Sequence, residues 1–134
     1  KAEKKDLGYL SALAHEMNLR HGDDLKPSPS ELASGWDRFE IYVVEQDKTV
    51  AGFLAGYNTY QFHAARPGFE IQNLFVRESF RGQGLGQLLM EETIRLKKEQ
   101  GISRFSLQVH ENNREARALY AALGFRDKPR DHVR

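Results

Sequence analysis

The chain has 134 residues, 40% of them hydrophobic, a length that suits one domain with a single core burying roughly two thirds of the unfolded surface. Its 20 basic and 19 acidic residues leave a net charge of +1, which argues against a nucleic-acid binder with a broad basic surface. Because cysteine is absent, disulfides, thiolate metal sites and a cysteine nucleophile are excluded.

Two helical patterns occupy the first part of the chain. Asp6 can cap a helix whose apolar residues follow helical spacing as far as Arg20. The segment Ser28-Pro29-Ser30-Glu31 then reads as a capping box with proline at the first helical position, and Gly35 supplies the stop. A second, short helix is therefore predicted, joined to the first by a polar connector.

Three strands are predicted next. The segments 39–45 and 49–57 are rich in β-branched and aromatic residues, and the break between them predicts an antiparallel hairpin. Gly52 and Gly56 lie inside the second strand and indicate a bulge or a close approach of two backbones. After a polar segment over 63–68, a strand over 69–76 leads into a glycine-rich loop.

That loop, Arg81-Gly82-Gln83-Gly84-Leu85-Gly86, opens an amphipathic helix that runs to Gln100, with Gly101 as its C-cap. Glycines permit positive φ and let phosphate oxygens approach the backbone. The start of a helix adds free N–H groups and roughly half a positive charge, and Arg81 adds a full charge. The loop is therefore a candidate phosphate site.

Spacing separates the known phosphate-binding motifs. The dinucleotide fingerprint would need a glycine where the chain has Gln87, and an acidic residue about 20 positions further on. A P-loop would need Lys-Ser or Lys-Thr after the glycines, and neither follows them. For this loop alone, a glycine-rich turn without a ligand remains the alternative.

The last part of the chain predicts one more strand and one more helix. Phe105, Leu107 and Val109 alternate with polar residues, and Asn112-Asn113 then opens a helix that carries a leucine and tyrosine face. A crossover helix between the strand over 69–76 and the strand at 105–109 makes these two strands parallel within an otherwise antiparallel sheet.

Two separately placed motifs resemble those of the GNAT N-acetyltransferase superfamily. Arg81-x-x-Gly84-x-Gly86 resembles its Q/R-x-x-G-x-G/A signature, and residues 107–125 resemble its strand followed by N-x-x-A-x-x-L-Y-x-x-x-G-F. The resemblance implies an α/β (α+β) GNAT acyltransferase fold, with a mixed, mostly antiparallel central sheet flanked by helices and a splayed parallel strand pair that binds the cofactor. We expect one such domain over residues 1–134, without the family's first and last strands.

The same resemblance implies direct transfer of the acetyl group of acetyl-CoA to a primary amine of a small molecule or peptide, without a metal. Tyr120 matches the tyrosine that protonates the leaving thiolate; its alternative role is a core aromatic. Asn113 would contact the cofactor near its thiol and is otherwise a plain helix cap. The expected cofactor-binding residues are Phe75, Val76, Arg81, Gly82, Gln83, Gly84, Leu85, Gly86, Asn113 and Tyr120.

The general base is harder to assign. Many family members carry a glutamate where this chain has Gln72, which cannot accept a proton as a carboxylate does. Glu70 lies two residues earlier on the same strand face and could act through a water, although an ordinary solvated carboxylate is the alternative. Gln72 and Glu70 therefore join Tyr120 as the candidate catalytic residues. His63 and His110 are further candidates for the base.

The resemblance places the acceptor site around residues 15–37 and 57–63. Acidic residues in the first of these regions would suit a cationic amine or are solvated surface charges: Glu16, Asp23, Asp24, Glu31 and Asp37. The first half of the chain is also distantly similar to spermidine/spermine acetyltransferases, while a protein lysine or an N-terminal amine stays open as the acceptor.

We expect neither nucleic acid nor a membrane as a partner, and a homodimer is a candidate because dimers are common in the family. No apolar run approaches the ~18 residues of a membrane span and no signal-peptide pattern opens the chain, so we expect a cytoplasmic protein. The alternative function is a non-catalytic acyl-CoA-binding module of the same fold.

Overall fold

The computed structural model describes residues 1–109 and 113–126. Two helices and three strands come first, and a helix, a strand and a helix follow, in an order close to the predicted one. The elements are α1 (Leu7–Arg20), α2 (Pro29–Ser34), β1 (Glu40–Gln46), β2 (Thr49–Gln61), β3 (Arg66–Val76), α3 (Leu85–Glu99), β4 (Arg104–Leu107) and α4 (Arg114–Ala122).

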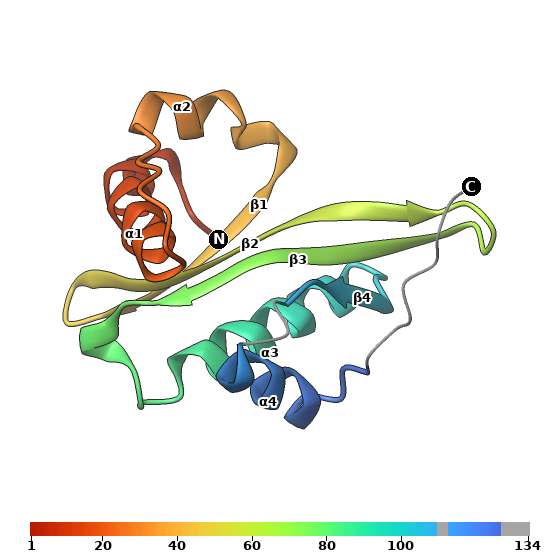
Figure 1. The fold of residues 1–134 in the computed structure, drawn as a ribbon. Helices are drawn as coiled ribbons and strands as arrows, with labels where there is room; N and C mark the ends of the chain where they lie inside the picture. The colour runs from red at the N-terminus through yellow and green to blue at the C-terminus, as the bar shows by residue number, and fades with distance from the viewer. Residues whose placement is uncertain (110–112, 127–134) are drawn as a thin grey trace.

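The strands form one sheet in the order β1-β2-β3-β4. β1 pairs with β2, and β2 with β3, in antiparallel orientation. β3 and β4 run parallel because α3 crosses over between them. α1 and α2 cover one face, and α3 and α4 cover the other (Figure 1). The predicted mixed, mostly antiparallel sheet flanked by helices is therefore confirmed.

Both predicted helices at the start of the chain are present. Ser28 and Glu31 form the expected capping box at α2, because the Glu31 N–H donates to Ser28 Oγ at 3.1 Å and the Ser28 N–H donates to Glu31 Oε1 at 3.0 Å. Asp6 precedes α1 but does not cap it. Its Oδ2 instead accepts the N–H of Glu3 at 2.9 Å, within a short 3₁₀ turn that leads into the helix.

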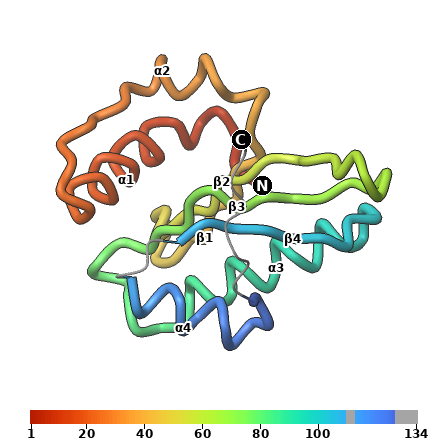
Figure 2. The backbone as a smooth tube through the Cα atoms, turned by 45° about the vertical axis from the view of Figure 1, so that its right-hand side comes forward, coloured from red at the N-terminus to blue at the C-terminus, as the bar shows by residue number. Residues whose placement is uncertain are grey.

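The β2–β3 hairpin is longer than predicted. The polar segment expected over 63–68 contracts to a turn over 62–65, so Pro67 and Gly68 belong to β3. A proline this close to the start of a strand costs little, because few ladder bonds need its missing N–H. The hairpin therefore projects past α1 and α2 (Figures 1 and 2). β4 is shorter than predicted and ends at Leu107, before Val109.

The bulge indicated by the glycines of β2 is present. Ala55 pairs with Asn73 and Gly56 pairs with Ile71, which leaves Gln72 without a cross-strand partner. A Cβ at position 56 would lie 2.5 Å from the Phe69 ring and 2.6 Å from the Glu70 carbonyl oxygen, so only glycine fits there.

The bulge also changes which side chains face which helix layer. Before it, Phe69 and Ile71 point into the core under α3, and after it Phe75 points into the core under α1. The core on the α1 side contains Ala2, Leu10, Leu13, Met17, Val50, Phe53, Ala55 and Phe75. The core on the α3 side contains Tyr42, Leu54, Phe69, Ile71, Leu89, Met90 and Ile102.

Within the described residues, no helix is long and apolar enough to cross a bilayer.

Candidate active site

β3 and β4 separate part of the way along their length. Their pairing ends at Ile71 and Leu107, while β3 continues to Val76 without a β4 partner in the described chain. The Arg77 N–H donates to the Ala51 carbonyl at 2.8 Å, so Val76, which pairs with Gly52, belongs to the set whose N–H and C=O point away from β2. We call this unpaired edge of β3 the slot.

Strand alternation decides which residues offer their backbone to the slot. Leu74 is two residues before Val76, so its N–H and C=O also face the slot, whereas those of Phe75 face Phe53 on β2. The sequence pointed to two consecutive residues, Phe75 and Val76, and only Val76 of that pair presents its backbone to this edge. Leu74 is a residue that the sequence analysis missed, although period-two alternation could have suggested it.

The glycine-rich loop follows β3 and leads into the first turn of α3. No described group accepts a hydrogen bond from the backbone N–H groups of residues 82–87. Gly82 and Gly84 have φ of +80° and +76°, and a Cβ at either position would meet open space. Gly86 lies inside the helix, where a Cβ would contact Val76 at 3.7 Å and Leu119 at 3.9 Å.

Three other predicted residues frame this loop. Arg81 donates from Nε to the Val76 carbonyl at 2.8 Å, and its Cζ lies 5.2 Å from the centre of the Phe75 ring. No described carboxylate pairs with Arg81, so its positive charge remains available beside the loop. Gln83 accepts from Gln46 Nε2 at 2.6 Å, which fastens the loop to the end of β1. Leu85 is the half-buried first residue of α3.

Tyr120 lies on α4, and Asn113 immediately precedes this helix, which is on the same side of the sheet as α3 (Figure 1). Asn113 Oδ1 accepts the Ala116 N–H at 3.2 Å, so this side chain does cap the helix. Tyr120 packs edge-on against Phe125, with ring centres 6.1 Å apart. Burial raises the pKa of Tyr120, which keeps the phenol protonated at neutral pH.

The two candidate base positions on β3 have different surroundings. Glu70 is half-buried and accepts hydrogen bonds from the Tyr57 hydroxyl and, at 3.2 Å, from Ser106 Oγ. Gln72 occupies the bulge, is exposed, and makes no hydrogen bond within the described residues. The sequence analysis did not identify Ser106, and it included Tyr57 only as the first residue of the acceptor region 57–63. Their contacts with Glu70 depend on the strand register.

The histidine candidates are not brought to the slot. His63 lies in the exposed turn between β2 and β3, at the opposite end of β3 from the glycine-rich loop. A strand of this length separates the two ends by roughly 30 Å. His110 lies outside the described residues.

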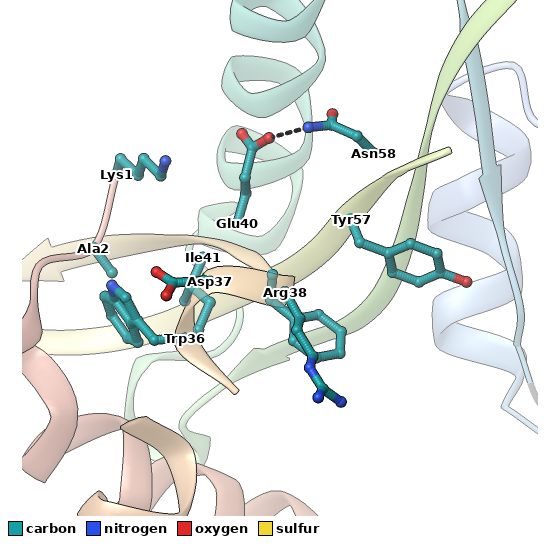
Figure 3. Close-up of a pocket in the computed structure, with 10 residues that line it drawn as sticks. Lys1, Ala2, Trp36, Asp37, Arg38, Glu40, Ile41, Tyr57 and Asn58 are labelled. Atoms are coloured by element: carbon teal, nitrogen blue, oxygen red, sulfur yellow. Dashed lines mark hydrogen bonds between the residues drawn. The ribbon is translucent and has the colours of Figure 1, made fainter. Parts of the chain in front are cut away.

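Four of the five acidic residues suggested for the acceptor region already have a partner within the described residues. Glu16 pairs with Arg77 at 3.1 Å, Glu31 completes the α2 capping box, Asp23 accepts the Leu25 N–H at 3.1 Å and Asp24 lies 3.0 Å from His15 Nε2. Asp37 instead lines a cavity of about 310 Å³ at the start of β1 (Figure 3). The cavity is lined by Lys1, Ala2, Trp36, Asp37, Arg38, Phe39, Glu40, Ile41, Tyr57 and Asn58.

Residues 1–109 and 113–126 contain no group of three or more histidine or acidic side chains that could hold a metal ion. The groups that could do chemistry here are the slot, the glycine-rich loop, Tyr120 and the Glu70 carboxylate. Together they offer an anion cradle, backbone donors, a protonated phenol and a carboxylate.

The sequence pattern of the acetyltransferase (GNAT) family matches residues 10–125. The chain is 33% identical over 107 residues to a Bacillus subtilis (strain 168) protein provisionally named a [ribosomal protein bS18]-alanine N-acetyltransferase, a match that covers 71% of the chain and 67% of that protein.

A thialysine N-epsilon-acetyltransferase of Sus scrofa is 32% identical over 77 residues, which covers 55% of the chain and 45% of that protein. The match thus spans less than half of this relative. The crystal structure of a probable acetyltransferase superposes with a TM-score of 0.87 at 19% identity, over 98% of the chain and 93% of that structure. At this identity the likeness shows a common fold.

Proposed function

Because the chain belongs to the acetyltransferase (GNAT) family, we propose that it transfers the acetyl group of acetyl-CoA to a primary amine of a small molecule or peptide. The observation that carries the proposal is the anion cradle of residues 82–87 directly beside the slot edge of β3. A cofactor with a pyrophosphate at one end of a long amide-containing arm needs these two features side by side.

The residues present fit this cofactor. Gly82 and Gly84 leave the space beside the backbone free of side chains, and the helix dipole of α3 and Arg81 favour a negative group there. We assign the pyrophosphate to the backbone of residues 81–86. The amide-bearing arm is assigned to the backbone of Leu74 and Val76, which would add a strand-like partner to the unpaired edge of β3.

Bound acetyl-CoA would supply the acetyl group: the amide C–N bond forms as the thioester C–S bond breaks, and of the two protons lost by the ammonium group one reaches solvent and the other the thiol sulfur. The Leu74 N–H faces the slot and is the proposed donor to the carbonyl oxygen that gains charge. One donor of this kind contributes about 10²-fold or more to the rate.

Tyr120 is the proposed general acid. Its raised pKa means that the hydroxyl holds a proton at neutral pH and can release it to a developing thiolate. Glu70 is the proposed general base, acting through a water, since Gln72 lacks a titrating group. Asn113 keeps its amide N–H₂ free of described partners while its oxygen caps α4, and we propose that this group contacts the cofactor near the thiol.

The acceptor in this proposal is a primary amine. The names of the relatives point to amines of different kinds, an alanine of a ribosomal protein and thialysine among them. Asp37 and the Trp36 ring line the cavity at β1 together with Lys1 and Arg38, so this cavity presents charges of both signs. From the names of the relatives, a cationic amine is the first class to test.

The test is steady-state release of the CoA thiol with a panel of amines: thialysine, ornithine, spermidine and a peptide with N-terminal alanine. We expect turnover with at least one of them, with product mass increased by one acetyl group. Saturable acetyl-CoA binding without transfer to any amine would contradict the proposed acetyltransferase activity. It would favour the alternative function, a non-catalytic acyl-CoA-binding module.

A further inference from the structure

One row of side chains crosses three strands of the sheet. Tyr57 on β2 pairs with Glu70 on β3, which pairs in turn with Ser106 on β4. Because Phe69 and Ile71 point into the core under α3, the intervening Glu70 points to the opposite face. Ser106 is exposed, and Tyr57 and Glu70 are half-buried, so an acceptor can approach the row from this face.

The two hydroxyl groups hold the carboxylate from opposite sides. Tyr57 donates to Glu70 Oε2, and Ser106 Oγ donates to Glu70 Oε1 at 3.2 Å. The pKa of Tyr57 is raised, chiefly because its hydroxyl bonds to this carboxylate, so the phenol remains a donor at neutral pH. Each carboxylate oxygen keeps a second lone pair that can accept a proton.

The row lies where β3 and β4 begin to separate. Glu70 immediately precedes Ile71, the last β3 residue paired with β4, so its carboxylate lies at the end of the slot. Tyr57 has a second role, because it also lines the cavity that contains Asp37 (Figure 3). A molecule in that cavity would therefore contact Tyr57, whose hydroxyl donates a hydrogen bond to Glu70.

We propose that Tyr57 and Ser106 are positioning residues, which hold the Glu70 carboxylate in the one orientation that takes a proton from the acceptor amine. The proposal rests on the proposed function and adds two residues to it. A carboxylate that accepts from two donors keeps one orientation beside the end of the slot, whereas a carboxylate that has lost a donor can rotate away.

The test measures kcat and KM for Tyr57→Phe and Ser106→Ala. We expect kcat to fall about 10-fold to 100-fold in each, with KM for acetyl-CoA unchanged. Ser106→Thr, which keeps the hydroxyl, should recover most of the loss. Tyr9→Phe on α1 and Ser103→Ala just before β4 are controls whose hydroxyls have no described partner, and both should retain the wild-type kcat.

A double-mutant cycle separates positioning from general loss of structure. In a Glu70→Gln background, Tyr57→Phe and Ser106→Ala should have almost no further effect, because the group that they position has been replaced. Additive effects, or an unchanged kcat in the single variants or in Glu70→Gln, would overturn the inference. Absence of turnover in the wild-type protein would instead refute the proposed function.

Discussion

The two ends of helix α3 treat their polar groups in opposite ways. Near the C-terminal end, Lys97 is only 1% exposed, yet its Nζ donates to Glu40 at 2.8 Å and to Gln100 at 3.0 Å and lies 4.8 Å from the Phe69 ring centre. At the N-terminal end, the N–H groups of residues 82–87 have no partner in the described chain.

The difference follows from burial. A buried charge without partners would cost several kcal/mol, and Lys97 has two hydrogen-bond partners and an aromatic ring beside it. Glu40 there also accepts from Tyr42 at 2.7 Å and Asn58 at 2.8 Å. At the other end, residues 82–84 and Gln87 are exposed, so N–H groups without a described partner cost little there and are available for an anion. Stability and ligand binding should therefore respond separately to substitutions at the two ends.

The largest effect is expected from Glu40→Ala. The substitution removes the acceptor of three donors and leaves the buried Lys97 charge without its carboxylate, which should lower the free energy of unfolding by about 3–5 kcal/mol. Urea denaturation measures this loss. Glu99→Ala, an exposed glutamate in a surface ion pair at the same end of α3, should cost less than about 1 kcal/mol. Equal losses in the two variants would break the comparison.

Two glycines at opposite ends of α3 provide a matched pair for ligand binding. Gly84 and Gly101 have φ of +76° and +90°, and a Cβ at either would meet open space, so Gly84→Glu and Gly101→Glu should each cost about 1–2 kcal/mol of stability. Only Gly84→Glu places a bulky anion at the cradle. Its affinity for acetyl-CoA should fall about 100-fold or more by calorimetry, while Gly101→Glu binds as the wild type does; parallel losses would show that the site is misplaced.

Tyr120→Phe separates chemistry from binding at the N-terminal end. Removal of the proposed proton donor should lower kcat about 100-fold and leave the calorimetric affinity for acetyl-CoA unchanged. Tyr9→Phe, on an exposed tyrosine of α1, is the control and should retain full activity. A Tyr120→Phe variant with wild-type kcat would show that Tyr120 is a core aromatic residue and not the general acid.

The smallest effect concerns acid stability at the Lys97 end. Burial alone would raise the pKa of Glu40, but the hydrogen bonds from Lys97, Tyr42 and Asn58 and the Lys97 charge hold it below its ordinary value of 4.5. This stabilisation is present above pH 4.5 and is lost as the pH falls through the lowered pKa. Glu40→Gln should therefore flatten the acid limb of a stability–pH curve, and an unchanged limb would contradict the assignment.

Local chemistry made much of the fold predictable. The capping box at Ser28 and the helix after Gly84 depend on residues close in sequence, and the structure has both where the sequence placed them. The parallel pairing of β3 and β4 followed from the crossover helix between them. The predicted polar segment over 63–68 was too long, because Pro67 and Gly68 are typical of turns. In the structure both residues lie near the start of β3.

The site was only partly predictable, because strand register is not a local property. Gly56 indicated a bulge, but nothing in the sequence showed that Gln72 occupies it or that the Leu74 backbone faces the slot. The contacts of Glu70 with Tyr57 and Ser106 join residues 13 and 36 positions apart, and only the pairing of three strands brings them together. The glycine-rich loop, by contrast, carries its own geometry within a few residues.

Calorimetric titration of the wild-type chain with acetyl-CoA, and separately with NAD and ATP, tests the central claim most directly. The unpaired N–H groups of residues 82–87 and the slot edge at Leu74 and Val76 together predict saturable, one-to-one binding of acetyl-CoA alone. Absence of binding, or equal binding of all three ligands, would contradict the account, since the loop would then be a turn or a general phosphate site.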